Sequence, residues 1–164
     1  MNFSIDDTSP NFVWSSGADD WKGQAPNQVA INSNYFLSTY HATQSKGSNV
    51  AITFVGAAIQ LYGSKGPNHG NYSVTYDSAI KFFAGFSAQT QYQQLLFSRT
   101  FGTNYSETHT VILKNEEDYW LDLDFAVLSI AYVVIVRPGL LCFPCPRLVF
   151  HQIAPSPWVV VYRR

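Results

Sequence analysis

The sequence predicts an all-β protein, a jelly-roll β-sandwich of about eight short strands. Several short stretches alternate apolar with polar residues, and a period of two places each apolar set on one face of a sheet. Glycine, proline and asparagine separate these stretches, as expected for turns between strands, and no stretch has the period of a convincing amphipathic helix. Aromatic residues make up 16% of the chain and charged residues only 13%, a balance typical of a β protein with a polar but weakly charged surface.

The clearest part of this pattern runs from Val50 to Tyr76 and predicts three strands and two turns. Apolar and polar residues alternate within residues 50–54, 59–62 and 72–76. Gly56 lies in the first turn, and residues 63–70 supply further glycines that adopt turn conformations which β-branched residues resist. These segments are therefore expected to form antiparallel strands over one core.

The remaining strands are shorter or less regular. They are predicted at residues 3–7, 12–15, 35–39, 93–98, 109–114 and 120–130. Residues 80–86 fit either a strand or a short buried turn, whereas residues 16–34 are expected to form a long surface loop and residues 41–48 a polar turn. In the last strand, Leu123 is expected on one face, with Asp122 and Asp124 on the opposite face.

Charge and apolar patterning divide the chain near residue 130. All eleven acidic residues lie at or before Asp124, whereas residues 125–164 contain four arginines and no acid. The apolar stretches after Ile130 are interrupted by arginine and proline, so none provides the ~20 consecutive apolar residues of a membrane-spanning helix. We therefore expect one β-sandwich domain, residues 1–130, followed by an atypical apolar and basic tail, residues 131–164, outside the core fold.

Several sequence-wide signals argue against other classes of protein. The net charge of −1 gives no indication of nucleic-acid binding, and the first ten residues lack the charged start and apolar run of a signal peptide. Cys142 and Cys145 form a lone CxxC in a proline-rich segment, which we interpret as incidental. No metal-binding HExxH and no GxSxG nucleophile motif is present, so no enzymatic activity is expected.

Several segments resemble a group of fungal (basidiomycete) proteins that are secreted or displayed at the cell surface. The segments are SIDDTSP (4–10), YGSKGPNHGNYSVTYD (62–77), YQQLLFS (92–98), HTVILKN (109–115) and LDLDF (121–125), and together they span most of residues 3–128. The resemblance implies a galactose-binding-like β-sandwich outside the cell with a carbohydrate or cell-surface partner. Many members of the group continue into a polar linker and a membrane span, and this chain shows neither after Phe125.

Two predicted loops combine an aromatic or histidine ring with polar side chains, as a sugar site requires. A sugar packs its C–H face on an aromatic ring while polar groups bind its hydroxyls, and such sites usually lie on loops of a rigid scaffold. The candidate ligand-binding residues are Asp19, Asp20 and Trp21 in the first loop and Lys65, Asn68 and His69 in the second, with Trp14 and Tyr35 as further rings. For Tyr62, Tyr72 and Trp120, a place in the core or in cross-strand pairs is the favoured interpretation.

Paired aspartates lie near both ends of the predicted domain, Asp6 with Asp7 and Asp122 with Asp124. In jelly rolls of this type the terminal strands are often neighbours, and similar sugar-binding modules hold a structural calcium there. Calcium takes six to eight oxygen ligands, which carboxylates from both strands would help to supply. The alternative, which we favour, is that these acids are solvated or cap turns.

The leading expectation is a non-enzymatic extracellular recognition module that binds carbohydrate. Asn2, Asn71 and Asn104 each begin an N-glycosylation sequon, which agrees with the secretory route but also arises by chance in a chain rich in Asn and Ser. The alternative is a protein-interaction or structural ectodomain without a sugar site, which would expose an apolar patch on a sheet face. A hydrolase would instead require a cleft with converging titratable groups.

Overall fold

The computed structural model describes residues 1–17, 20–23, 33–130, 133–134, 150–151 and 159–161. Contacts within the chain divide it into two units, one formed by residues 2–130 and the other by residues 131–164 with Met1. The first unit is a β-sandwich, as predicted, and its described residues contain one short 3-10 turn besides strands. Cys142 and Cys145 lie outside the described residues.

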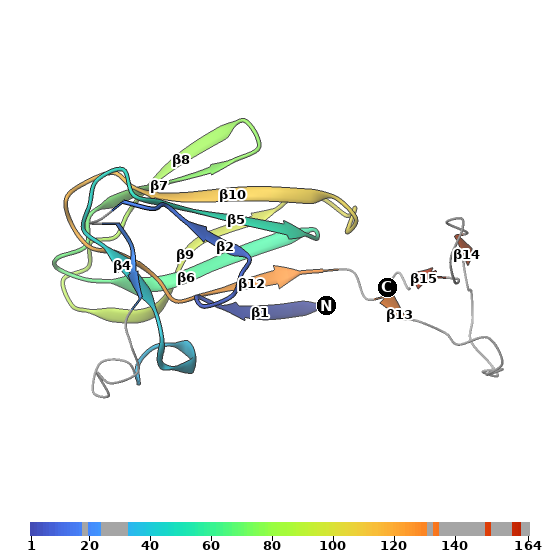
Figure 1. Ribbon diagram of the computed structural model, residues 1–164, viewed down its shortest axis with the longest axis horizontal. Helices are drawn as coiled ribbons and strands as arrows, with labels where there is room; N and C mark the ends of the chain where they lie inside the picture. The colour runs from blue at the N-terminus through green and yellow to red at the C-terminus, as the bar shows by residue number, and fades with distance from the viewer. Residues whose placement is uncertain (18–19, 24–32, 131–132, 135–149, 152–158, 162–164) are drawn as a thin grey trace. The chain divides into compact units, whose positions relative to one another are not determined.

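One layer of the sandwich is a four-stranded antiparallel sheet (Figure 1). Its strands, in spatial order, are β1 (Asn2–Asp6), β12 (Phe125–Ser129), β6 (Ala58–Lys65) and β9 (Gln91–Thr100). The first and last strands of the domain are therefore neighbours, since β1 pairs with β12 and Asp6 lies opposite Phe125. This sheet brings the two aspartate pairs of the sequence together.

The other layer is a five-stranded antiparallel sheet. In spatial order it contains β2 (Phe12–Trp14), β5 (Asn49–Val55), β10 (Thr108–Asn115), β7 (Asn71–Tyr76) and β8 (Ala79–Ala84). The alternation predicted for residues 50–54 and 72–76 is confirmed, since Val50, Ile52 and Val74 are fully buried. They pack with side chains of the first sheet, such as Ile59 and Leu61, to form one core.

A third, smaller sheet lies between sequence-distant segments and was not predicted as a unit. It consists of β11 (Leu121–Leu123), β4 (His41–Thr43) and β3 (Lys22–Gly23). The expectation of a turn throughout residues 41–48 is therefore wrong for its first three residues. Strand β4 pairs with β11 on one side and with β3 on the other. These partners stabilise it as a strand, although its own polar sequence does not have a strand pattern.

Residues 35–39, predicted as a strand, form a 3-10 turn at Phe36–Ser38 instead. Leu37 and Ser38 have positive φ angles of 50° and 64°, which non-glycine residues adopt rarely and only when the surroundings impose them. The aromatic composition suggested a strand, but long-range hydrogen bonds to Asp124 and Asp7 hold the turn.

The predicted strand at residues 120–130 is divided between two sheets. Asp124 separates β11 from β12, and its backbone N–H donates to the carbonyl of Tyr62 in β6 at 2.8 Å. Asp122 and Asp124 are 4% and 0% exposed, so these two acids are not solvated. The other half of the favoured interpretation, that the acids cap turns, fits Asp124, which accepts a hydrogen bond from the Phe36 N–H at the start of the 3-10 turn. Leu123 is also fully buried, and this segment has no solvent-facing side.

Residues 80–86 were expected to form either a strand or a short buried turn. The structure has the strand β8 (Ala79–Ala84) there. It is an edge strand of the five-stranded sheet, and Ile80 and Phe82 are 59% and 70% exposed. Phe83 points the other way and stacks on Tyr72 with ring centroids 5.4 Å apart.

The second unit contains a small antiparallel sheet of β13 (Val133–Val134), β15 (Val159–Val161) and β14 (Phe150–His151). Across the residues that the structure describes, no helix has the length and apolar character needed to traverse a bilayer.

Candidate functional site

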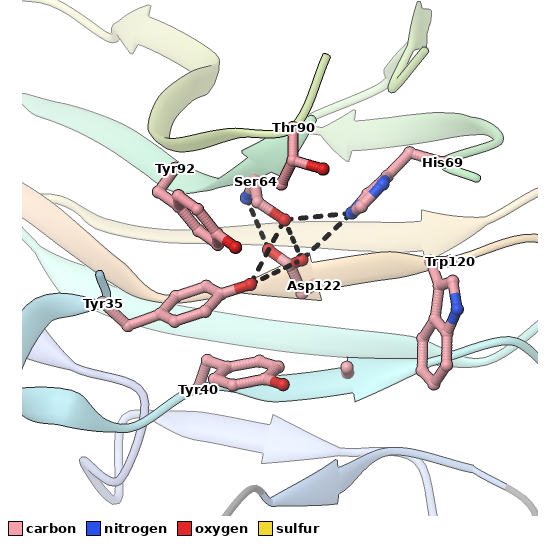
Figure 2. A pocket seen from close by; sticks show the side chains of 9 residues that line it. Tyr35, Tyr40, Ser64, His69, Thr90, Tyr92, Trp120 and Asp122 are labelled. Carbon is pink, nitrogen blue, oxygen red and sulfur yellow. Dashed lines mark hydrogen bonds and ion pairs between the residues drawn. The ribbon is translucent and has the colours of Figure 1, made fainter. Parts of the chain in front are cut away.

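A hollow of about 160 Å³ lies where β11 packs beside β6, and it is named here the aromatic hollow. Its lining comes from segments far apart in the chain: Tyr35, Tyr40, Ala42, Ser64, His69, Thr90, Tyr92, Trp120 and Asp122 (Figure 2). The combination of several rings with a few converging polar groups is typical of a small-molecule site.

Four aromatic rings form the walls of the aromatic hollow. Tyr35 stacks on Tyr40 with centroids 3.9 Å apart, and the Tyr92 ring meets Tyr35 edge-on at 5.2 Å. Figure 2 shows these tyrosines on one side of the hollow and Trp120 on the other. Trp120 is 36% exposed, and among the described residues no ring stacks on its indole. Trp120 is therefore not a core ring, although its backbone forms a β-bridge with His69, and the exposed part of its indole borders the hollow.

The polar floor of the aromatic hollow is centred on the buried carboxylate of Asp122. The Ser64 backbone N–H and hydroxyl both donate to this carboxylate, and His69 Nε2 lies 3.1 Å from Asp122 Oδ2 and 3.0 Å from Ser64 Oγ. The Tyr35 hydroxyl also lies 3.4 Å from Asp122 Oδ2. Burial, followed by the nearby Asp122 charge, raises the pKa of Tyr35 well above its ordinary value, so this phenol stays protonated and donates.

Local backbone features place Ser64 and Asp122 against each other. A Cβ on Gly63 would lie 2.4 Å from the Asp122 carbonyl oxygen, so only glycine permits this approach of β6 to β11. The β6–β9 pairing is irregular beside Gly63, and Gln93 of β9 has a φ of 51°. Irregular pairing of this kind re-aims side chains near functional sites, and here it occurs next to Tyr92.

The paired aspartates hold the segment that carries Tyr35 and Tyr40. Asp124 Oδ1 accepts a hydrogen bond from the Phe36 N–H at 2.8 Å, and Asp7 Oδ1 accepts one from the Thr39 hydroxyl at 2.6 Å. His41 Nδ1 also contacts Asp7 Oδ2. These contacts explain the turn at residues 36–38, because buried carboxylates must be satisfied by nearby donors.

Asp124 is the least satisfied of these acids. Its Oδ2 is buried and has no hydrogen-bond partner among the described residues, and its side chain is fully enclosed. Burial, together with the charges of Asp122, Asp7 and Asp6, raises the pKa of Asp124 to about 8. This carboxyl therefore holds a proton near neutral pH.

The same acids were the candidate calcium ligands. The structure brings Asp6 and Asp7 close to Asp124, since Asp7 N donates to the Asp124 carbonyl at 3.0 Å. Within residues 2–17, 20–23 and 33–130, however, no three His, Cys, Asp or Glu side chains are grouped as a metal site requires. Protein donors occupy most of these carboxylate oxygens, and the calcium site stays a prediction.

A second hollow, of about 180 Å³ and named here the polar hollow, shares Ala42 and Trp120 with the first. Its other lining residues are Asp20, Lys22, Thr43, Gln44 and Ser45. Asp20 accepts hydrogen bonds from the Gly17 N–H and the Ser48 hydroxyl, and the bond from Ser48 contributes most to lowering the pKa of Asp20. Asp20 is therefore charged at neutral pH.

The candidate residues of the first predicted loop are only partly placed at these hollows. Asp20 lines the polar hollow, whereas Asp19 lies outside the described residues. The Trp21 indole packs on Trp14 at 4.9 Å, and its N–H donates to the Asn49 carbonyl at 2.9 Å. Trp21 lines neither hollow and supports the core, so its role in binding stays a prediction.

In the second predicted loop, His69 lines the aromatic hollow, whereas Lys65 and Asn68 line neither hollow. The loop positions Trp120, because the backbone N–H of Trp120 donates to the backbone carbonyl of Asn68 at 3.0 Å. The Gly70 N–H in turn donates to the Trp120 carbonyl at 3.2 Å. Five residues that line the aromatic hollow were missed by sequence reasoning: Tyr40, Ala42, Ser64, Thr90 and Tyr92. Ser64 alone had a sequence signal, because it follows Gly63 at the end of an otherwise apolar alternation.

The three glycosylation candidates differ in their settings. Asn104 lies exposed between β9 and β10, and its amide donates to Glu107 at 2.8 Å. Asn71 and Asn2 begin strands β7 and β1, where their side chains bond Glu117 and Ser129. All three asparagines are exposed, and glycosylation stays a prediction.

Comparison with known proteins shows likeness at the level of fold. No protein-family model matches the chain, and no curated protein matches it. Among solved structures, a two-domain esterase active on acetylated mannans is similar over 79% of this chain and 36% of that one, with 12% identity and a TM-score of 0.58. A family two carbohydrate esterase from Cellvibrio japonicus is similar over 79% of this chain and 33% of the esterase, with 16% identity and a TM-score of 0.51.

The catalytic domain of a GH87 alpha-1,3-glucanase in complex with nigerose is similar over 84% of this chain and 30% of that one, with 11% identity and a TM-score of 0.53. This chain thus spans about a third of the length of these structures. The likeness shows a β-sandwich fold that occurs in carbohydrate-active proteins.

Proposed function

We propose that the chain is a non-enzymatic carbohydrate-recognition module that binds a sugar unit in the aromatic hollow. The observation that carries the proposal is the pairing of unstacked or half-buried rings, above all Trp120, with a polar floor at Asp122. A pyranose presents C–H groups to a ring and hydroxyls to hydrogen-bonding groups, and this hollow offers both. Its fold, shared with proteins that act on mannans and glucans, supports the same class of ligand.

Ser64, His69 and Asp122 invite a comparison with a hydrolytic triad, and their geometry favours binding instead. In a triad, the histidine meets serine through one ring nitrogen and aspartate through the other. Here Ser64 Oγ and Asp122 Oδ2 both contact Nε2 of His69, while Nδ1 is buried without a hydrogen-bond partner among the described residues. Asp122 therefore does not orient the imidazole through its second ring nitrogen, as the aspartate of a triad does, and the contacts hold the Asp122 carboxylate in place.

A glycan array probed with the full-length protein tests the proposal. We expect binding to a restricted set of glycans, and we expect Trp120→Ala and Tyr40→Ala each to abolish it. Tyr105→Ala is the matched control, because Tyr105 is 42% exposed and lines neither hollow. No specific glycan bound by folded wild-type protein, or equal loss with Tyr105→Ala, would overturn the proposal.

An interaction module for a protein partner is the second candidate, and the exposed apolar side chains of β8 favour it. Ile80 and Phe82 lie two residues apart on an edge strand, and exposed apolar groups on a sheet edge are typical of contact surfaces. This candidate predicts that Phe82→Asp removes partner binding while glycan binding is unchanged. Glycan binding lost with Trp120→Ala alone would favour the carbohydrate function.

We further propose an extracellular or cell-surface location, as the sequence resemblance implies. Its support is the exposure of all three sequon asparagines, of which Asn104 lies in a loop between β9 and β10. Expression in a eukaryotic secretory host, followed by glycosidase treatment, tests this location. A mass shift lost in Asn104→Gln supports it, and secretion without any attached glycan argues against use of the sequons.

A further inference from the structure

The aromatic and polar hollows adjoin one another. They share two lining residues, Ala42 and Trp120, so the indole forms a wall of both. Ala42 is the middle residue of β4, and it lies opposite Lys22 of β3 in the sheet register. The spacing of the two hollows is therefore fixed by paired strands rather than by loops alone.

Neither hollow is large enough to hold a typical small-molecule ligand alone. Their volumes are about 160 and 180 Å³, and small-molecule pockets usually measure ~300–1,000 Å³. Each hollow suits one ring-sized unit. A chain of linked units is the kind of ligand that would occupy both at once, with Trp120 between neighbouring units.

The two hollows differ in chemistry. Tyrosines dominate the aromatic hollow, whereas the polar hollow has Lys22 and Gln44, both exposed. Neither Lys22 nor Gln44 has a side-chain hydrogen bond or ion pair within the part of the chain that the structure describes. Asp20, by contrast, is already bonded to Ser48 and Gly17. Lys22 and Gln44 are thus the groups free to bind ligand hydroxyl oxygens.

We propose that the polar hollow is a second subsite and that the ligand is an oligosaccharide of at least two linked units. One unit lies in the aromatic hollow against Trp120 and the tyrosines, and the adjacent unit accepts hydrogen bonds from Lys22 and Gln44. This inference rests on the proposed carbohydrate function and adds the length of the ligand and the residues that recognise its second unit.

Calorimetric titration of the full-length protein tests the proposal with sugars of increasing length. The probes are glucose, nigerose and the alpha-1,3-linked glucose tetrasaccharide, together with mannose, β-1,4-mannobiose and β-1,4-mannotetraose. For the series that binds, we expect the disaccharide to bind about tenfold or more tightly than the monosaccharide, as one or two added hydrogen bonds would give. Little further gain is expected for the tetrasaccharide.

The double variant Lys22→Ala/Gln44→Ala locates this gain. It should bind the monosaccharide as the wild type does and lose most of the advantage of the disaccharide. Lys46→Ala is the matched control, since Lys46 is exposed on the turn after β4 and lines neither hollow. Trp120→Ala should weaken both ligands because its ring borders both hollows.

The outcomes separate this inference from the function on which it rests. Monosaccharide binding with no gain for the disaccharide overturns the second subsite and leaves the aromatic hollow as a sugar site. A gain that survives in Lys22→Ala/Gln44→Ala overturns the assignment of the polar hollow. If wild-type protein binds neither series at any length, the carbohydrate function and the second subsite both fall.

Discussion

Two groups of aromatic rings in the sandwich use the same residue types to opposite ends. In the core, Tyr72 is fully buried, stacks on Phe83, and donates its hydroxyl to the Leu96 carbonyl at 2.8 Å. In the aromatic hollow, Tyr40 is half-buried, and Trp120 has no stacking partner among the described residues. Ring content alone therefore does not mark a binding site. The two groups differ in their partners. In the core, other protein groups cover the rings and bond their hydroxyls, whereas in the aromatic hollow part of the ring surface is exposed next to the hydrogen-bonding side chains around Asp122.

The largest expected effect separates these two groups by stability. Tyr72→Ala should lower the free energy of unfolding by about 3–5 kcal/mol, because it removes a fully buried ring and leaves a cavity. Tyr40→Ala should cost less, about 0.5–1.5 kcal/mol for the lost aromatic pair together with the contribution of the half-buried ring area. Urea denaturation of both variants measures the difference. Equal costs would show that the hollow is part of the core.

The sequence predicted the core rings better than the hollow rings, and the reason is physical. Residues of β5, β7 and β10 alternate because one face of each strand is buried, so a local pattern reports their place in the core. Tyr40 and Tyr92 reach the hollow only through the turn at residues 36–38 and the irregular β9 pairing. Those features depend on hydrogen bonds such as Phe36 N–H to Asp124, across 88 positions of the chain.

The packing of Trp21 and Trp120 was difficult to predict for the same reason. Trp21 is flanked by acids, Lys22 and glycine, which made it a loop candidate, but Trp14 packs against its ring. Trp120 precedes an apolar stretch, which suggested a strand position. The backbone carbonyl of Asn68 holds it immediately before β11, where it forms an isolated β-bridge with His69. In both cases the partner is a residue that no local pattern identifies.

The second expected effect is a pH dependence of stability. It arises at Asp124, which lies near Asp6, Asp7 and Asp122, and not in the apolar core. The pKa of Asp124 is raised from 3.8 to about 8, so the folded state binds this proton more tightly than the unfolded state does. The resulting stability is fully present below the ordinary aspartate pKa and is lost as the pH rises toward about 8. The slope is at most about 1.4 kcal/mol per pH unit, so a loss on the order of a few kcal/mol is expected from pH 4 to pH 8.

Comparison of wild type with Asp124→Asn isolates this contribution from other titrating groups. The asparagine is neutral at every pH and retains an oxygen for the Phe36 N–H, so its stability should fall less between pH 4 and pH 8. Urea denaturation at pH 4, 6 and 8 measures the difference between the two proteins. A difference that does not change with pH would contradict the protonated state of Asp124.

The smallest effect compares two tyrosine hydroxyls, one in each region. Tyr72→Phe leaves the buried Leu96 carbonyl without its donor, and we expect a loss of about 1–3 kcal/mol. Tyr35→Phe removes contacts at 3.3 and 3.4 Å to Ser64 and Asp122, which are long for O–H···O bonds. Asp122 keeps its bonds from Ser64, so stability should change by less than about 0.5 kcal/mol.

The same two variants should affect ligand affinity in the opposite order from stability. They therefore test whether the core rings and the hollow rings have separate roles. Tyr35→Phe removes a hydroxyl that borders the aromatic hollow and should weaken sugar binding, whereas Tyr72→Phe changes a group that lines neither hollow and should leave binding unchanged. Denaturation and titration on the same two samples give both readouts. If Tyr72→Phe weakened binding more than Tyr35→Phe, the rings of the core and of the hollow would form one cooperative unit. The distinction between core rings and binding rings would then be wrong.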